Sequence, residues 1–272
     1  MQDILSQKID SLPPLPETII ELEEFKKSTD KEPITLLQIV EKDALIVSTL
    51  LKVSNSAMFG FRSSVETPSR ALNLLGINFT LSIAFGSAIK NALDTNLKAY
   101  GIGSDDFMRI SNMSSNLISQ WISKVDFDLK EELLLPVFLQ ETGKFILSDL
   151  ANEQGKTEEF YAAIKASKDI AAVEKEFFGT TTSAITAAIF RHWKLSDNLI
   201  NMIEFVDDLD NCPDAHKHSA QILNVAKTAC NVLDPLSDES AEAAIAKAKS
   251  FGLDTAPLSK AIEKMQDRML DE

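Results

Sequence analysis

The chain has 272 residues, of which 44% are apolar and 25% are charged, as in ordinary globular proteins with a buried core. Its formal net charge of −14 gives no sign of the basic surface that nucleic-acid phosphates require. No apolar run reaches the roughly 20 residues of a spanning helix, and the first ten residues lack a signal-peptide pattern. We therefore expect a cytoplasmic protein with no nucleic-acid partner and no membrane insertion.

Apolar residues recur at spacings of three and four along almost the whole chain, which is the period of a helix. The chain has only 9 glycines, so long flexible connections are not expected. Cys212 and Cys230 have neither metal-binding nor redox spacing and are expected to be reduced thiols. These observations predict an all-α protein.

The first hundred residues are predicted to form short helices with clear start signals. Prolines 13, 14 and 16 end an N-terminal helical arm, and Pro33 suits the first turn of a later helix. Asp43 is placed to cap a buried helix over 45–53, and Pro68 begins another helix that runs to Gly76. A long helix over 81–93 completes this part.

The clearest break is the segment 100–104, after which Ser104 begins a new helix with two acidic residues in its first turn. The remaining helices are expected over about 130–150, 157–167, 170–177, 181–193, 196–206, 216–233, 238–250 and 256–270.

Three segments carry a resemblance to a known family. They read LPPLPET from Leu12, then LLQIVEKDALIVSTLLKVSNSAMFG, then SRALNLLG ending at Gly76. In this order they resemble the HDOD domain, a relative of the HD metal-dependent phosphohydrolases, over roughly residues 10–210. The resemblance implies an HD-like helical core and a role in bacterial signal transduction. We expect an amino-terminal helical lobe over 1–100, the core over 101–235 and a carboxy-terminal helical extension over 236–272.

HD enzymes hold catalytic metals with histidines and aspartates, and the resemblance locates the corresponding positions here. The His-Asp pair corresponds to Gln140 and Glu141, and a later histidine to Thr182. A His-His pair corresponds to Val206 and Asp207. Two carboxylates without histidine are a poor metal site.

Two further positions are placed less sharply by the same comparison. The early histidine corresponds best to Ser111, and the final aspartate falls near Asn224 or Lys227. We therefore expect no catalytic residue, no bound metal and no cofactor. The resemblance implies a non-catalytic regulatory protein that contacts another protein of a signalling pathway. The alternatives are a residual metal-dependent phosphohydrolase and a sensor that binds a nucleotide or metabolite in the old HD pocket.

The segment after the helix over 45–53 holds the candidate interaction residues. They could line a cleft between the lobes or face a partner, and they are Asn55, Met58, Phe59, Phe61, Arg62 and Arg70. A structural interpretation is also open. Asn55 can occupy a left-handed position and bond free helix carbonyls, while the apolar side chains insert into the core.

Overall fold

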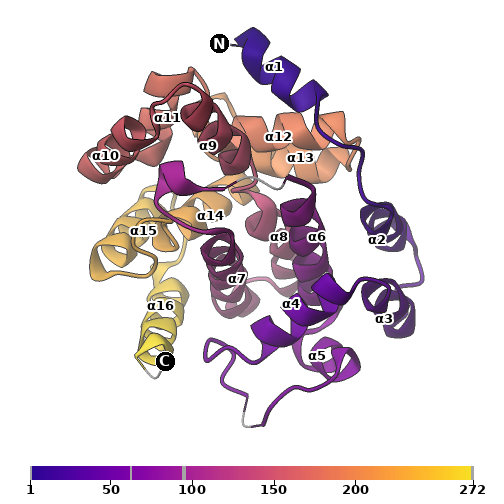
Figure 1. The fold of residues 1–272 in the computed structure, drawn as a ribbon. Coiled ribbons are helices and arrows are strands. Elements are labelled where there is room, and N and C mark those ends of the chain that lie inside the picture. Colours follow the sequence, from indigo (N-terminus) through magenta and orange to yellow (C-terminus); the bar gives the residue numbers. More distant parts are fainter. Residues whose placement is uncertain (1, 62, 94–95, 271–272) are drawn as a thin grey trace.

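The computed structural model describes residues 2–61, 63–93 and 96–270 of the chain (Figure 1). Within them the regular structure is helical, without a strand, as the sequence predicts. The first six helices are α1 (Gln2–Asp10), α2 (Glu17–Lys27), α3 (Pro33–Glu41), α4 (Ala44–Ser54), α5 (Pro68–Leu75) and α6 (Ile77–Leu93). A short 3₁₀ turn, η1 (Lys98–Tyr100), then leads to α7 (Ser104–Trp121).

The rest of the chain continues as helices joined by short connections. They are η2 (Ile122–Lys124), α8 (Phe127–Leu139), α9 (Gly143–Glu153), α10 (Thr157–Ser167), α11 (Ile170–Phe178), α12 (Thr182–His192), α13 (Asp197–Glu204), η3 (Leu209–Asn211), α14 (Asp214–Ala229), α15 (Asp238–Ser250) and α16 (Thr255–Met269). Among the described helices, none combines the length and apolarity needed to cross a bilayer.

The predicted start signals in the first part of the chain are confirmed. Asp43 Oδ1 accepts hydrogen bonds from the backbone N–H groups of Leu45, at 2.8 Å, and Ile46, at 3.3 Å. Pro33 and Pro68 each occupy the first turn of a helix. Both positions suit proline because the missing N–H would have no intrahelical partner there.

The centre of the molecule is built on α6, α7 and α8, which pack against one another (Figure 1). Helices α2 to α5 lie on one side of this centre, with α4 against α6 and α5 against α4, whereas α1 contacts α9 and α12. On the other side α9 packs on α12, α12 on α13, and α14 on α15. α16 returns to α7. The central α6 is buried around most of its circumference, so it serves both sides as core.

The predicted single helix over about 130–150 is wrong, because the chain forms α8 and α9 with a break between them. Gly143 begins α9 and allows close packing at the break. A Cβ at this position would lie 2.3 Å from the backbone oxygen of Thr182, so only glycine lets the start of α9 approach α12 this closely. The break carries Gln140 and Glu141, both of which are buried.

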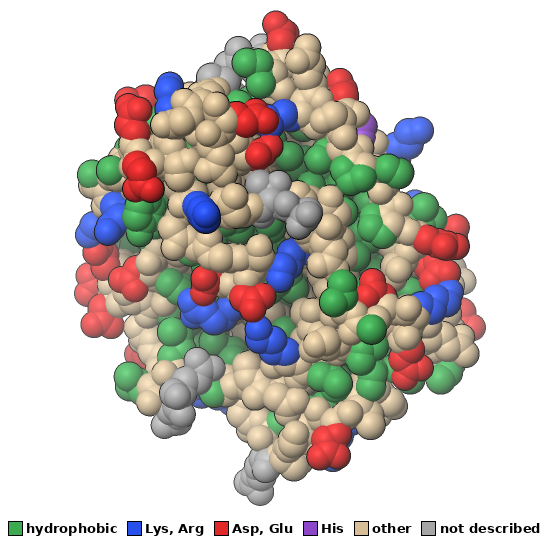
Figure 2. Space-filling model, in the orientation of Figure 1, with side chains coloured by type: hydrophobic (Ala, Val, Ile, Leu, Met, Phe, Trp, Pro, Cys, Tyr) green, Lys and Arg blue, Asp and Glu red, His purple; other side chains and the backbone are tan. Residues whose placement is uncertain are grey.

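The two ends of the chain each contact a part that is distant in sequence. In the N-terminal arm, Lys8 forms ion pairs with Asp149, at 2.5 Å, and Glu153, at 2.8 Å, on α9. At the other end Arg268 Nη1 on α16 donates to the backbone oxygen of Met58 at 2.6 Å. The face of the molecule drawn in Figure 2 carries intermixed acidic and basic side chains.

Candidate functional site

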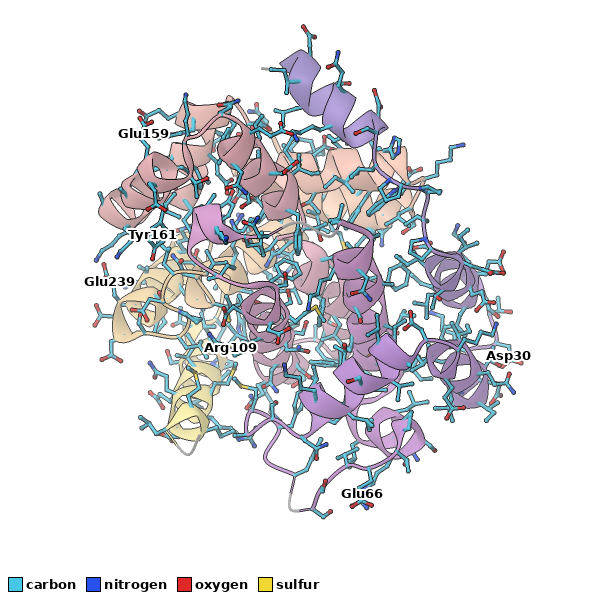
Figure 3. All side chains as sticks on the ribbon, in the orientation of Figure 1. Asp30, Glu66, Arg109, Glu159, Tyr161 and Glu239 are labelled. Carbon is cyan, nitrogen blue, oxygen red and sulfur yellow. The ribbon has the colours of Figure 1, made fainter. Side chains whose placement is uncertain are left out.

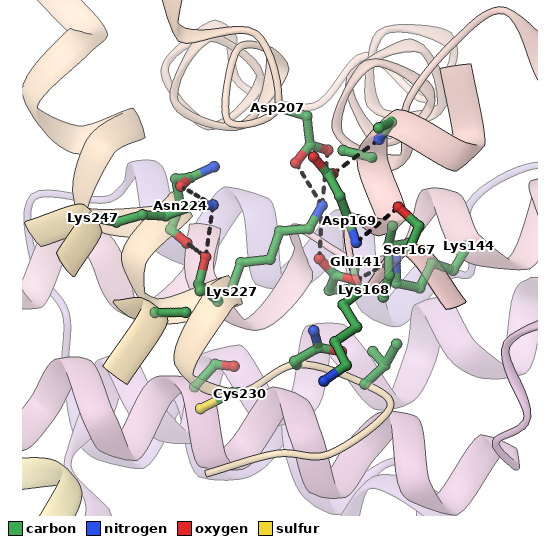
Figure 4. Close-up of a pocket in the computed structure, with 18 of the residues that line it drawn as sticks. Glu141, Lys144, Ser167, Lys168, Asp169, Asp207, Asn224, Lys227, Cys230 and Lys247 are labelled. Carbon is green, nitrogen blue, oxygen red and sulfur yellow. Dashed lines mark hydrogen bonds and ion pairs between the residues drawn. The ribbon is translucent and has the colours of Figure 1, made fainter. Parts of the chain in front are cut away.

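Five charged residues from separate parts of the chain meet at the break between α8 and α9, and Figure 4 labels four of them, Glu141, Lys144, Asp207 and Lys227. Glu141 lies in the break, Lys144 on α9 and Glu174 on α11. Asp207 follows α13, and Lys227 lies on α14. We call these five residues the charged cluster. It contains three carboxylates and two ammonium groups.

Lys144 is fully buried and lies between two carboxylates. Its Nζ is 2.8 Å from Glu141 Oε2 and 3.2 Å from Glu174 Oε1. The same ammonium group donates to the Thr182 hydroxyl at 3.2 Å and lies 4.5 Å from the ring centre of Tyr100. The ammonium group thus replaces its lost hydration with oxygen acceptors and a π face, which a buried cation requires.

Glu174 is also fully buried and has a complete set of donors. Its carboxylate accepts from the Thr182 backbone N–H at 2.6 Å, the Thr182 hydroxyl at 2.5 Å and the Tyr100 hydroxyl at 2.8 Å. Burial, and then the neighbouring carboxylate of Glu174, raises the pKa of Tyr100 well above its usual value. Tyr100 therefore acts here as a neutral hydrogen-bond donor.

Lys227 joins the remaining two carboxylates. Its Nζ donates to Asp207 Oδ1 at 2.9 Å and Oδ2 at 2.8 Å, and lies 3.1 Å from Glu141 Oε1. Burial alone would raise the pKa values of Asp207 and Glu141, but the two lysines outweigh burial and lower both. Burial would lower the pKa of Lys227, but Asp207 and Glu141 raise it. All three groups are therefore charged at neutral pH.

This donor set does not fit a divalent metal ion. The two lysine ammonium groups already lie between the carboxylates that a metal would have to share, at 2.8 to 3.2 Å. A dication would have to displace them or share the space with like charge. Within the described residues, no three His, Cys, Asp or Glu side chains are grouped so that they could hold a metal.

The structure brings some of the residues placed by resemblance into the cluster and leaves others beside it. Glu141, Asp207 and Thr182 are members or direct partners. Gln140 is buried, and both polar atoms of its amide lack a hydrogen-bond partner within the described residues. Val206 is buried, and its backbone oxygen accepts from the Asn224 amide at 2.7 Å.

Ser111, which the resemblance places at the early histidine, is buried on α7, and Ser114, one turn further along, lines the cavity next to the cluster. Lys144 and Glu174 were not recognised as partners from the sequence. The sequence feature that could have identified them is a charged residue at a position where the helical spacing predicts a core residue, as in the segment GKFIL. Lys227, near the position of the final aspartate, reverses the charge expected there.

A cavity of about 550 Å³ opens beside the cluster and reaches α11, α14 and α15 (Figure 4). Glu141, Asp207 and Lys227 lie on its wall, together with Lys247. The Lys247 ammonium group donates to Asn224 Oδ1 at 3.1 Å and to the Thr228 hydroxyl at 3.0 Å. Because these partners are neutral, the charge of Lys247 is not paired by them. The cavity therefore offers a cation, and its volume has room for a small polar molecule.

The candidate interaction residues lie apart from the cluster, at the end of α4 and in the following loop. The Asn55 amide donates to the Leu51 and Val65 carbonyls, and its oxygen accepts from the Val65 N–H at 2.8 Å. Its φ of −91° is not left-handed, so the predicted carbonyl bond is found without the predicted conformation. Asn55 thus holds the loop closed.

The aromatic side chains of this loop pack together. Phe59 and Phe61 are half-buried and stack at 5.7 Å, and Phe59 meets the edge of Phe79 at 5.3 Å. Met58 is buried, and the Arg70 side chain donates to the Ser63 hydroxyl at 2.5 Å. Arg62 lies outside the described residues. A partner-binding role for this loop stays a prediction.

Comparisons with known proteins agree on one family. A model of the HDOD domain matches residues 12–209. A curated relative from Treponema pallidum (strain Nichols), named "Uncharacterized protein", is 21% identical over 240 residues. The match covers 85% of this chain and 44% of that relative, so the chain spans less than half of the relative's length.

Two solved structures are similar over nearly the whole chain. A "Putative phosphohydrolase" from Shewanella amazonensis SB2B is 23% identical with a TM-score of 0.73, covering 97% of this chain and 94% of that one. A "Putative signal transduction protein" from Marinobacter aquaeolei VT8 is 18% identical with a TM-score of 0.70, covering 95% and 58%. At these identities the likeness concerns the fold alone.

Proposed function

Because the chain belongs to the HDOD family, we propose that it is a non-catalytic regulatory protein of bacterial signal transduction that acts by contacting another protein. One observation carries the non-catalytic part. Lys144 and Lys227 lie between Glu141, Glu174 and Asp207. The resemblance assigns two of these carboxylates, Glu141 and Asp207, to positions where HD enzymes carry metal ligands. Without a metal, these residues offer no means of activating a water molecule against a phosphate ester.

The signalling part of the proposal is supported by the family and by the similar structure from Marinobacter aquaeolei VT8, whose name assigns it to signal transduction. The charged cluster then has a structural task. It joins α9, α11 and α14 to the segment after α13, and it replaces the metal as the element that holds these parts together.

The first experiment tests for turnover. We expect the purified protein to hydrolyse phosphate monoesters and diesters no faster than a buffer blank, with Mg²⁺, Mn²⁺ or Zn²⁺ added. Hydrolysis that disappears in a Glu141→Ala variant would contradict the proposal. Stoichiometric metal in elemental analysis of the purified protein would support the residual phosphohydrolase instead.

A second experiment tests the role in the cell with Glu141→Gln. In this variant Lys144 keeps Glu174 and Lys227 keeps Asp207, so the fold should persist. A regulatory protein should still complement a deletion of its gene, whereas an enzyme that needs the Glu141 carboxylate should not. The two outcomes distinguish the regulatory protein from the enzyme, provided that the variant accumulates in the cell to the same protein level as the wild type.

The ligand-sensor alternative is favoured by one observation, the cavity of about 550 Å³ beside the cluster. A nucleotide or metabolite that binds there would raise the melting temperature of the protein. A thermal-shift screen in which such a ligand stabilises the wild type but not a Lys247→Met variant would favour the sensor. Lys247 is the matched choice because its ammonium group bonds only neutral oxygens.

A further inference from the structure

A second cavity, of about 250 Å³, lies on the opposite side of α7, where α4, α7 and α16 meet. Its walls are largely apolar and unusually rich in methionine. Four of the seven methionines of the chain line it, namely Met58, Met108, Met113 and Met269. Methionine side chains are flexible and polarisable, so such walls adapt to ligands of different outline.

One buried polar atom in this wall lacks a partner. Asn112 is 7% exposed and lines the cavity, and its Nδ2 donates to the Met108 carbonyl at 2.7 Å. That bond identifies Oδ1 as the free acceptor, and Oδ1 has no hydrogen-bond partner within the described residues. A buried acceptor without a donor is costly, so a donor supplied by a ligand would be favoured.

The other hydroxyl groups in the wall already donate to backbone carbonyls. Thr49 donates to the Leu45 carbonyl and Ser56 to the Val53 carbonyl. A water molecule needs two to four polar partners to be held in a cavity, and among the described lining residues Asn112 Oδ1 is the buried side-chain atom that lacks one. The cavity therefore suits a molecule with an apolar body and a single hydrogen-bond donor better than it suits ordered water.

The rim of the cavity is charged and largely exposed, with Lys90 half-buried. Asp105, at the start of α7, pairs with Lys52 of α4 and Lys90 of α6, each at 3.1 Å. Arg109 lies at the middle of the same face (Figure 3), where acidic and basic side chains gather (Figure 2). Exposed ion pairs contribute little free energy, so these side chains can move aside for entry.

We propose that this cavity binds a compact, mostly apolar small molecule, of the size of a two-ring aromatic, whose one donor bonds Asn112 Oδ1. The size follows from the volume, because an apolar cavity of about 150 Å³ accepts benzene. The proposal is independent of the charged cluster, which lies in a different part of the core. A ligand here would touch the N-terminal helices, α7 and α16 at once, so it would favour the arrangement in which they meet.

Indole and indene are the probes that test the proposal, because they have the same shape and only indole has an N–H donor. We expect indole to bind the wild type roughly three- to tenfold more tightly than indene, as for one hydrogen bond. Asn112→Leu should remove this preference and keep indene binding. Equal affinities in the wild type, or a preference that survives in Asn112→Leu, would overturn the assignment of the acceptor.

The site of binding is read from the wild-type protein with ¹³C-methyl-labelled methionine. Indole should shift the methyl resonances of Met58, Met108, Met113 and Met269 in NMR spectra. Met202, on α13 and outside this cavity, is the internal control and should not move. Unchanged resonances of the four lining methionines at millimolar indole would overturn the proposal, as would a shift at Met202 of equal size.

Discussion

Replacing Lys227 with methionine tests whether lysine holds the charged cluster together. The change removes the cation that lies within 3.1 Å of both Asp207 and Glu141. The Asp207 side chain is only 2% exposed, so water from the adjoining cavity replaces the lost partner only in part. Breaking a buried ion pair costs about 3–5 kcal/mol of unfolding free energy. We expect about 3 kcal/mol, because Asp207 keeps the Ser183 N–H and Glu141 keeps Lys144.

The cost should depend on pH in a defined direction. The lysines hold the pKa values of Asp207 and Glu141 below their usual range in the folded protein. Their pairing therefore contributes stability above the unfolded pKa values, near 4, and this contribution is lost as the pH falls further. Without Lys227 the buried carboxylates bind protons more readily. The difference between wild type and variant should thus be largest at pH 7 and smaller at pH 4.

Urea unfolding followed by circular dichroism at both pH values measures this difference. Glu239→Gln is the matched control, because it breaks an exposed ion pair. The Lys168 side chain of that pair is 61% exposed and the Glu239 side chain is 67% exposed. That pair should contribute less than about 1 kcal/mol. The reasoning is refuted if Lys227→Met costs no more than Glu239→Gln at pH 7, or if its cost is the same at pH 4.

Two further predictions concern local structure. Gly143→Ala should lower the free energy of unfolding by about 3 kcal/mol or more, because the new methyl group would meet the Thr182 backbone. Gly103→Ala is the control in the same urea titration and should cost less than about 1 kcal/mol, because its methyl group would meet only a carboxylate oxygen at 3.5 Å. Asn55→Ala should speed hydrogen exchange of the Val65 amide, which donates to Asn55, and an unchanged rate would show that the loop holds itself closed.

Local chemistry was enough to predict much of the fold. Asp43, Pro33 and Pro68 mark helix starts through caps and fixed backbone angles, which depend only on neighbouring residues. The break after α8 was missed, although the residues from Gln140 to Lys144 interrupt the apolar pattern there. What the sequence does not reveal is the close approach of α12, a contact across the fold that requires glycine at position 143.

The candidate site was predictable in part for the same reason. The resemblance placed Glu141, Thr182 and Asp207 at positions of metal ligands, and the structure brings these three residues together around the two lysines. The resemblance did not show that lysines occupy the site. Lys144 and Lys227 reach partners on other helices, and only the packing of α9, α11 and α14 brings those charges together. Pairing of distant charges leaves no periodic trace in a sequence.

The family match over residues 12–209 leaves out residues whose contacts stabilise the matched part of the fold. A fragment cut to those limits would lose Lys227, and with it the partner of Asp207, as well as Lys8 and its two ion pairs on α9. It would also lose α16, whose Arg268 donates a hydrogen bond to the backbone oxygen of Met58 in the loop after α4. Expression of the matched segment alone should therefore give a sparingly soluble, protease-sensitive product, and work on isolated domains of this kind is best done with boundaries drawn from the packing.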